Sequence, residues 1–201
     1  MQVRELDIEG SWEFTPPAFP DNRGRFAAPF QGEAFVTAVG HPLRLAQTNH
    51  SVSRRGVIRG VHFADVPPSQ AKYVYCPTGA LLDVIVDVRV GSPTFGQWTS
   101  VRLDSDRLNS VYISEGLGHA FVALAEDTAI AYICTEGYNP GAERGISPVD
   151  PALGLPWPSD IEPILSDKDR DAPTLAEAEA AGLLPVYADC LAYRDKLRGL
   201  S

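Results

Sequence analysis

The segment Leu82-Asp-Val-Ile-Val-Asp-Val-Arg-Val90 decides the fold class of this chain. Apolar side chains fill every second position in it: Leu82, Val84, Val86, Val88 and Val90. The positions between them hold Asp83, Asp87 and Arg89, with Ile85 as the exception. Because side chains alternate between the two faces of a strand, the pattern predicts a β-strand with its valines on one face. The following Ser92-Pro-Thr-Phe-Gly96 predicts a turn.

Short apolar segments continue on both sides of this strand. Seventeen glycines and seventeen prolines separate them, which is typical of an all-β sandwich or barrel. Further strands are expected at about residues 44–50, 56–63, 72–76, 98–103, 110–114, 119–125 and 129–135. The sequence therefore predicts a mainly β protein.

The composition changes after about residue 150, where the chain becomes irregular and rich in proline. Thr174 and Glu177 have the spacing of a capping box, and Gly182 is suited to end the helix that follows. A second helix is expected at about residues 188–198. We expect a single domain over residues 1–201, with a β core at about 20–150 and a helical appendage at about 170–200.

Bulk properties restrict the possible partners. The 201-residue chain has a net charge of −9 and a pI of about 4.8, which argues against a broad nucleic-acid surface. No apolar run approaches the ~18 residues of a membrane span. The N-terminus lacks the apolar core of a secretory signal, so we expect a cytoplasmic protein without membrane attachment. The three cysteines are far apart and are expected to be reduced thiols.

The most unusual chemistry lies in Gln47-Thr-Asn-His-Ser-Val-Ser-Arg-Arg-Gly-Val-Ile-Arg-Gly-Val-His62. A strand core does not need such a concentration of polar and cationic side chains, whereas a site that holds an anion and moves a proton does. A lone strand histidine is most often a hydrogen-bonded core residue, but His62 has Arg59 and Lys72 close in sequence. Nearby cations favour a neutral imidazole base, and Asp169 is a candidate partner for it.

Tyrosine is the other side chain suited to proton transfer in a dry pocket. Tyr132 lies in a predicted strand, where a core aromatic is the alternative interpretation. Tyr138 follows a glycine at a turn and could stack on a planar ring. Arg23 lies at a glycine turn, where it could meet a phosphate or belong to an ordinary surface turn.

The histidines do not favour a metal site. The sequence has no H-x-H pair, and two of its four histidines, His62 and His119, lie in strand-like segments that one barrel interior could hold. Metal sites of this kind need about three converging ligands. We therefore expect no metal, and the absence of a G-x-G-x-x-G motif fits a protein without a dinucleotide cofactor.

Ordered motifs over about 150 residues connect these segments to a known family. They are Phe19-x-Asp-x-Arg-Gly-x-Phe26, Gln47-x-Asn-x-Ser, Gly56-Val-x-Arg-Gly-x-His62, Pro67-Pro-x-Gln-x-Lys72, Asp83-Val-x-Val-Asp-x-Arg89, Ser92-Pro-Thr-Phe-Gly-x-Trp98, Gly118-His-Ala-Phe121, Tyr138-x-Pro, Glu143-x-Gly-Ile146, Asp150-Pro-x-Leu, Trp157-Pro and Leu165-Ser-x-Lys-Asp169. Together they resemble the dTDP-4-dehydrorhamnose 3,5-epimerase family, which has a cupin-type jelly-roll β-barrel.

The resemblance implies roles for individual residues. His62 matches the general base, Asp169 its carboxylate partner, and Tyr132 the general acid that protonates the opposite face. The resemblance places the substrate contacts at Arg23, Phe26, Gln47, Asn49, Arg59, Lys72, His119, Tyr138, Glu143 and Lys168. Among these, Arg23, Arg59 and Lys72 would bind the pyrophosphate and the developing enolate, and Tyr138 would stack on the thymine.

The implied reaction is epimerisation of a dTDP-4-keto-6-deoxyhexose at C3, C5 or both, without cofactor or metal, in a homodimer that exchanges strands. Ala28 stands where the family usually has a glutamate, and Ala120 replaces a common glycine, which favours a relative from antibiotic deoxysugar pathways. Three alternatives stay open. They are a dTDP-4-keto-6-deoxyglucose 3,4-ketoisomerase, a non-catalytic sugar-nucleotide-binding cupin and a metal-dependent cupin dioxygenase.

Overall fold

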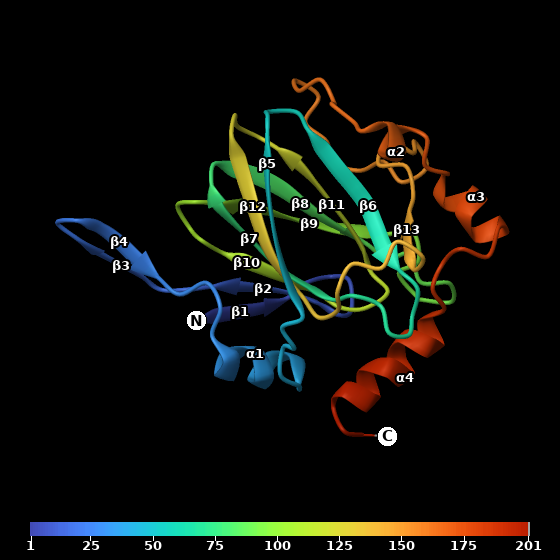
Figure 1. The fold of residues 1–201 in the computed structure, drawn as a ribbon, viewed down its shortest axis with the longest axis horizontal. Coiled ribbons are helices and arrows are strands. Elements are labelled where there is room, and N and C mark those ends of the chain that lie inside the picture. Colours follow the sequence, from blue (N-terminus) through green and yellow to red (C-terminus); the bar gives the residue numbers. More distant parts are fainter. Residues whose placement is uncertain (201) are drawn as a thin grey trace.

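The computed structural model describes residues 1–200, and they form two antiparallel β-sheets packed face to face (Figure 1). The six-stranded sheet has the order β1 (Gln2–Glu5), β2 (Ser11–Thr15), β10 (Ser110–Ile113), β7 (Lys72–Thr78), β12 (Thr128–Cys134) and β5 (Gln47–Ser53). The five-stranded sheet has the order β13 (Glu143–Gly145), β6 (Ile58–Ala64), β11 (Gly118–Ala123), β8 (Ala80–Val86) and β9 (Trp98–Asp104). The predicted cupin-type jelly roll is confirmed.

The segment that predicted the fold is β8, and both of its faces are buried. Leu81 and Ile85 point between the sheets, where they pack with side chains from β7, β10 and β12. Val84 and Val86 lie on the opposite face, in a cluster with Leu153, Leu184 and other residues of the C-terminal segment. Burial on both faces explains why Ile85 occupies one of the alternate positions that otherwise hold charged residues.

The strand ends at Val86, four residues before the end of the alternating pattern. The carboxylate of Asp87 causes this early end, because it accepts hydrogen bonds from the Arg89 guanidinium and from the hydroxyls of Ser92 and Thr94. Asp87 and Arg89 are both buried, so the ion pair closes the turn within the protein interior.

The other expected strands are observed as β5 to β7 and β9 to β12, with β5 displaced by three residues toward the C-terminus. The capping box of Thr174 and Glu177 begins α3 (Leu175–Ala180), and the second expected helix is α4 (Tyr187–Leu197). The strands β1 and β2 extend the six-stranded sheet to residues before about 20, where the β core was expected to begin. The helix α1 (Gly32–Val39) was not expected; Phe35 and Val39 bury it against Phe14 and Tyr73.

A separate hairpin of β3 (Ala18–Asp21) and β4 (Gly24–Ala27) projects away from the barrel (Figure 1). Its cross-strand pair Phe19 and Phe26 is 58% and 68% exposed. Arg25 connects the hairpin to the loop after β9 through Asp106. The hairpin therefore carries two large apolar rings that the rest of this chain does not cover.

None of the helices among residues 1–200 is long and apolar enough to cross a membrane.

Candidate active site

A cavity of about 220 Å³ lies between the two sheets. Its walls are Asn49, Ser51, Arg59, His62, Gln70, Lys72, His119, Phe121, Tyr132, Tyr138 and Glu143. Eight of these eleven residues are among the predicted site residues; the exceptions are Ser51, Gln70 and Phe121. All three exceptions belong to the family motifs given above. They were not predicted as site residues because their uncharged side chains suggested no role in proton transfer or anion binding.

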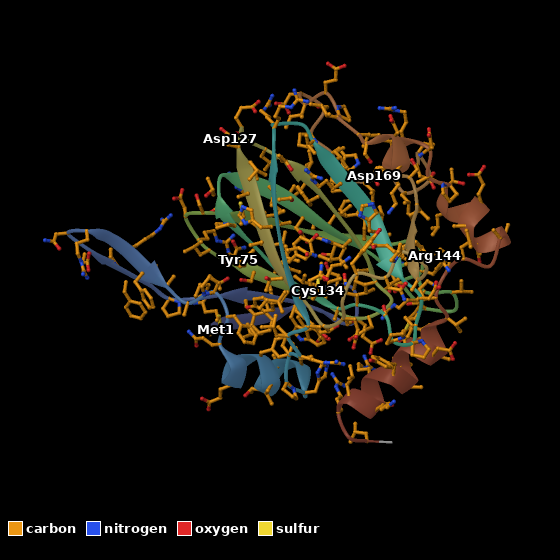
Figure 2. All side chains as sticks on the ribbon, viewed as in Figure 1. Met1, Tyr75, Asp127, Cys134, Arg144 and Asp169 are labelled. Atoms are coloured by element: carbon orange, nitrogen blue, oxygen red, sulfur yellow. The ribbon has the colours of Figure 1, made fainter. Side chains whose placement is uncertain are left out.

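His62, on β6, is hydrogen-bonded to Asp169 at 2.7 Å between Nε2 and Oδ1. Asp169 lies on the short helix α2 (Asp167–Arg170), beside β6 in Figure 2, and the Ser166 side chain caps that helix by accepting from the Asp169 backbone N–H. Burial alone would raise the pKa of Asp169, but hydrogen bonding and the charge of His62 outweigh it, so the pKa lies below its ordinary value. Asp169 is therefore an anionic partner that fixes the ring.

Gly56, two residues before β6, and Gly60, within β6, allow the segment that carries Asp169 and the strand β11 to approach this strand. Gly56 has φ +91°, and a Cβ there would lie 2.6 Å from the Glu162 carbonyl oxygen. Ile164 continues this contact through backbone hydrogen bonds with Gly56 and Ile58. Gly60 has φ +114°, and a Cβ there would lie 2.4 Å from the His119 carbonyl oxygen. The glycines in the motif ending at His62 thus position the histidine between two neighbours.

His119 on β11 is the direct cross-strand partner of His62, as expected for two histidines in one barrel interior. Its Nε2 is 2.7 Å from Asp83 Oδ2, and the Asp83 side chain is fully buried. The other carboxylate oxygen, Asp83 Oδ1, has no partner among the described residues. Asp83 was not among the predicted site residues, although a carboxylate in the middle of an apolar strand was the signal for it.

Tyr132 lies on β12, in the sheet opposite His62, and lines the same cavity. Burial raises its pKa above the ordinary value, and Cys134 acts in the same direction, while Asn49 and Arg59 oppose the shift. The hydroxyl therefore stays protonated at neutral pH, as a proton donor must. The two candidate proton-transfer groups thus face one cavity from different sheets.

Two cationic side chains, Lys72 and Arg59, line the same cavity. Lys72 is buried, and burial lowers its pKa although the Glu143 carboxylate opposes the shift. Arg59 is exposed at the cavity wall and donates from Nε to the Ser53 hydroxyl. A buried ammonium and a guanidinium beside a histidine base are suited to stabilise negative charge on a substrate oxygen.

The remaining predicted residues divide into two groups. Gln47 and Lys168 are not among the residues that line the cavity: Gln47 donates to Asn49 in its wall, and Lys168 is exposed and next to Asp169 in the sequence. Arg23 and Phe26 do not reach the cavity at all. They lie on the projecting hairpin, where the Arg23 guanidinium pairs with Asp21 of its own turn. One chain therefore does not bring all the predicted contacts together.

No group of three or more His, Cys, Asp or Glu side chains within residues 1–200 is arranged to hold a metal ion.

Comparison with known proteins agrees with this geometry. The family model described as dTDP-4-dehydrorhamnose 3,5-epimerase matches residues 5–177. The chain belongs to the dTDP-4-dehydrorhamnose 3,5-epimerase family. A dTDP-4-dehydrorhamnose 3,5-epimerase from Mycolicibacterium smegmatis is 54% identical over 198 residues, which cover 98% of each chain. A dTDP-4-dehydro-6-deoxyglucose 3-epimerase from Streptomyces bikiniensis is 52% identical over 185 residues, 92% of this chain and 94% of that protein.

A solved structure extends the likeness to three dimensions. The 3'-monoepimerase from Streptomyces bikiniensis in complex with dTDP-quinovose superimposes with a TM-score of 0.94 at 50% identity, covering 96% of this chain and 98% of that one. The predicted membership of the dTDP-4-dehydrorhamnose 3,5-epimerase family is confirmed, and an epimerase of dTDP-linked ketosugars is favoured over the alternatives. These relatives include both 3,5- and 3-epimerases at nearly equal identity, so identity alone does not choose between one carbon and two.

Proposed function

We propose that this protein epimerises a dTDP-4-keto-6-deoxyhexose at C3 and/or C5, with His62 as base and Tyr132 as acid. The observation that carries the proposal is that these two groups face one cavity from opposite sheets, with Lys72 and Arg59 beside them. Inversion at carbon needs proton removal on one face and proton return on the other. The barrel supplies two such faces.

The base step follows from the hydrogen bond between His62 and Asp169. An Nε2–H that donates to the carboxylate leaves the lone pair on Nδ1. That lone pair removes the proton α to the C4 ketone, and the C–H electron pair moves into an enolate. Asp169 stabilises the imidazolium that results, because its carboxylate is already ionised. Lys72 and Arg59 stabilise the negative charge on the C4 oxygen.

The acid step belongs to Tyr132. Its hydroxyl gives a proton to the enolate carbon from the opposite face, the oxygen keeps the electron pair as a phenolate, and the ketone is restored. Solvent then reprotonates the tyrosine and takes the proton from His62. General acid–base groups of this kind contribute about 10²–10⁴-fold each.

We assign the nucleotide end to Tyr138, and we expect Glu143 and Lys168 to contact the substrate. Tyr138 is 61% exposed at the cavity rim, where its ring is free to stack on a base. The relative from Streptomyces bikiniensis was solved with dTDP-quinovose, which supports a dTDP-linked substrate here. The antibiotic-pathway setting, the cytoplasmic location and the single-domain extent stay predictions.

We propose further that the protein is a homodimer whose β3–β4 hairpin completes the partner's site. Arg23 and Phe26 are expected to contact substrate, yet both lie on an arm that leaves the barrel (Figure 1). In a two-fold dimer each hairpin can reach the other subunit's cavity. Arg23 would then meet the pyrophosphate there, and Phe26 would find the apolar contact that it lacks in one chain.

Product analysis tests the proposed reaction. The purified protein is incubated with dTDP-4-keto-6-deoxyglucose, the ketone is reduced with borohydride, and the configurations at C3 and C5 are determined by NMR. We expect inversion at C3, C5 or both, and no inversion with His62→Ala. A ketone at C3, seen by NMR in a portion taken before the reduction, would support the ketoisomerase instead. Unchanged substrate that nevertheless binds tightly would support the non-catalytic binding protein.

A further inference from the structure

Gln47 and Asn49 form a hydrogen-bonded pair on β5 directly beside the proposed general acid. In the pairing of β5 with β12, Asn49 lies opposite Tyr132 and Gln47 lies opposite Cys134. Directly opposite residues in an antiparallel pair share one face of the sheet. The two amides therefore lie on the cavity side of the sheet, next to the tyrosine.

The orientation of both amides follows from a single backbone donor. The Tyr138 N–H can only donate, and it donates to Gln47 Oε1 at 3.0 Å. Gln47 must then present Nε2 to its other neighbour, Asn49 Oδ1, at 2.6 Å. This contact leaves the Asn49 nitrogen with two hydrogens. One points toward Cys134 Sγ at 3.5 Å, and the other is free to serve the Tyr132 hydroxyl.

Asn49 also acts on the protonation of Tyr132. The neighbouring Asn49 side chain lowers the pKa of Tyr132, against the stronger effect of burial. An N–H donor lowers a tyrosine pKa by stabilising the phenolate. A phenolate is what remains after Tyr132 has given its proton to carbon, so Asn49 stabilises the acid in the form that the reaction produces.

We propose that Asn49 and Gln47 are positioning residues for the general acid, which hold the Tyr132 hydroxyl in place and link it to the backbone of Tyr138. The inference rests on the proposed function above. It differs from a substrate contact because both amides act through Tyr132. It also connects the nucleotide end of the site to the acid, since Gln47 holds the chain at Tyr138 and the amide of Asn49 at once.

The test separates proton removal from inversion. Wild type and variants are incubated with dTDP-4-keto-6-deoxyglucose in D2O, and NMR follows both exchange and inversion at the reacting carbon. Asn49→Leu is expected to lower the inversion rate about tenfold, while exchange by His62 stays within about twofold. Asn49→Asp, which keeps the acceptor for Gln47 and loses the donor, is expected to show the same loss. Gln47→Leu is expected to lower the inversion rate less than Asn49→Leu does.

The decisive comparison uses Tyr132→Phe. If Asn49 acts through the tyrosine, adding Asn49→Leu to Tyr132→Phe causes no further loss of turnover. Gln97→Leu is the matched control, because Gln97 is exposed and outside the cavity; it is expected to behave as wild type. Equal loss of exchange and inversion, a rise in KM alone, or an undiminished effect of Asn49→Leu in the Tyr132→Phe background would overturn the inference. A wild type that neither exchanges nor inverts would overturn the proposed function as well.

Discussion

At the scale of single residues, the site consists of groups whose partners prepare them for proton transfer. His62 has an anionic partner in Asp169, and Tyr132 is kept protonated by burial. The residue types and motifs allowed these roles to be predicted from sequence. The proximity of His62 and Asp169 could not be predicted, because they are 107 positions apart in sequence and tertiary contacts such as the docking of Ile164 on β6 bring them together.

Asp169→Asn tests the pairing directly. The amide keeps the size of the carboxylate but offers no charge to the imidazolium, so turnover is expected to fall by about 10²–10⁴-fold at pH 7.

The same variant tests the charge state of Asp169 through stability. The pKa of Asp169 is lowered in the folded state. Its contribution to stability is therefore present above the unfolded pKa of about 3.9 and is lost as the pH falls through the folded pKa. Urea unfolding of wild type and variant should differ at pH 7, and the difference should shrink as the pH falls below about 3.9; a difference that does not change with pH would contradict this assignment.

At the scale of secondary structure elements, period-two patterns predicted most strands, and a capping box predicted α3. The ends of the elements were harder to predict from sequence, because a tertiary ion pair ends β8 at Val86. The helix α1 and the strand β2 were missed, since their burial depends on side chains from distant segments such as Tyr73 and Tyr112. The strand β1 was missed because its residues are exposed and it is held by its pairing with β2.

Two glycine substitutions test how β6 is positioned. Gly60→Ala would place a methyl group 2.4 Å from the His119 carbonyl oxygen, whereas Gly91, also at positive φ, has no atom within 4 Å. Gly91→Ala is expected to cost about 1 kcal/mol from backbone strain alone. Gly60→Ala is expected to cost about 3 kcal/mol or more, and to lower activity by displacing His62. Chemical unfolding measures both, and equal losses would show that crowding at Gly60 is unimportant.

The turn after β10 contains a buried acid that serves no catalytic step. Burial raises the pKa of Glu115 to about 7, well above the unfolded value of about 4.3. The folded protein therefore binds more protons than the unfolded chain between these values, so stability falls as the pH rises through about 7. Glu115→Gln is expected to raise the free energy of unfolding by about 2 kcal/mol at pH 8 and by much less at pH 5. A variant that is no more stable than wild type at pH 8 would contradict the pKa assignment.

At the scale of the whole molecule, the jelly roll places most of the chemistry in one cavity, but the hairpin with Arg23 and Phe26 points elsewhere. The motif around Arg23 was found from sequence, whereas its position outside the barrel depends on how β3 and β4 leave the sheet and on the contact of Arg25 with Asp106. The whole-molecule consequence is the homodimer proposed above.

Mixing two inactive variants tests shared sites. If Arg23 serves the partner's cavity, a hybrid of Arg23→Ala and His62→Ala subunits contains one site with both residues intact. Co-refolded mixtures are then expected to recover roughly a quarter of wild-type activity, since half of the dimers are hybrids with one complete site. Light scattering after size exclusion provides the mass. A monomeric wild type, or mixtures with no recovered activity, would contradict the shared site.

The central claim is that His62 removes a proton next to the C4 ketone of a dTDP-linked sugar. The most direct measurement is NMR location of deuterium after incubation with dTDP-4-keto-6-deoxyglucose in D2O, with His62→Ala beside the wild type. We expect deuterium at C3, C5 or both in the wild type and none above background in the variant. Wild type that incorporates no deuterium, or a variant that incorporates it at the wild-type rate, would contradict the account.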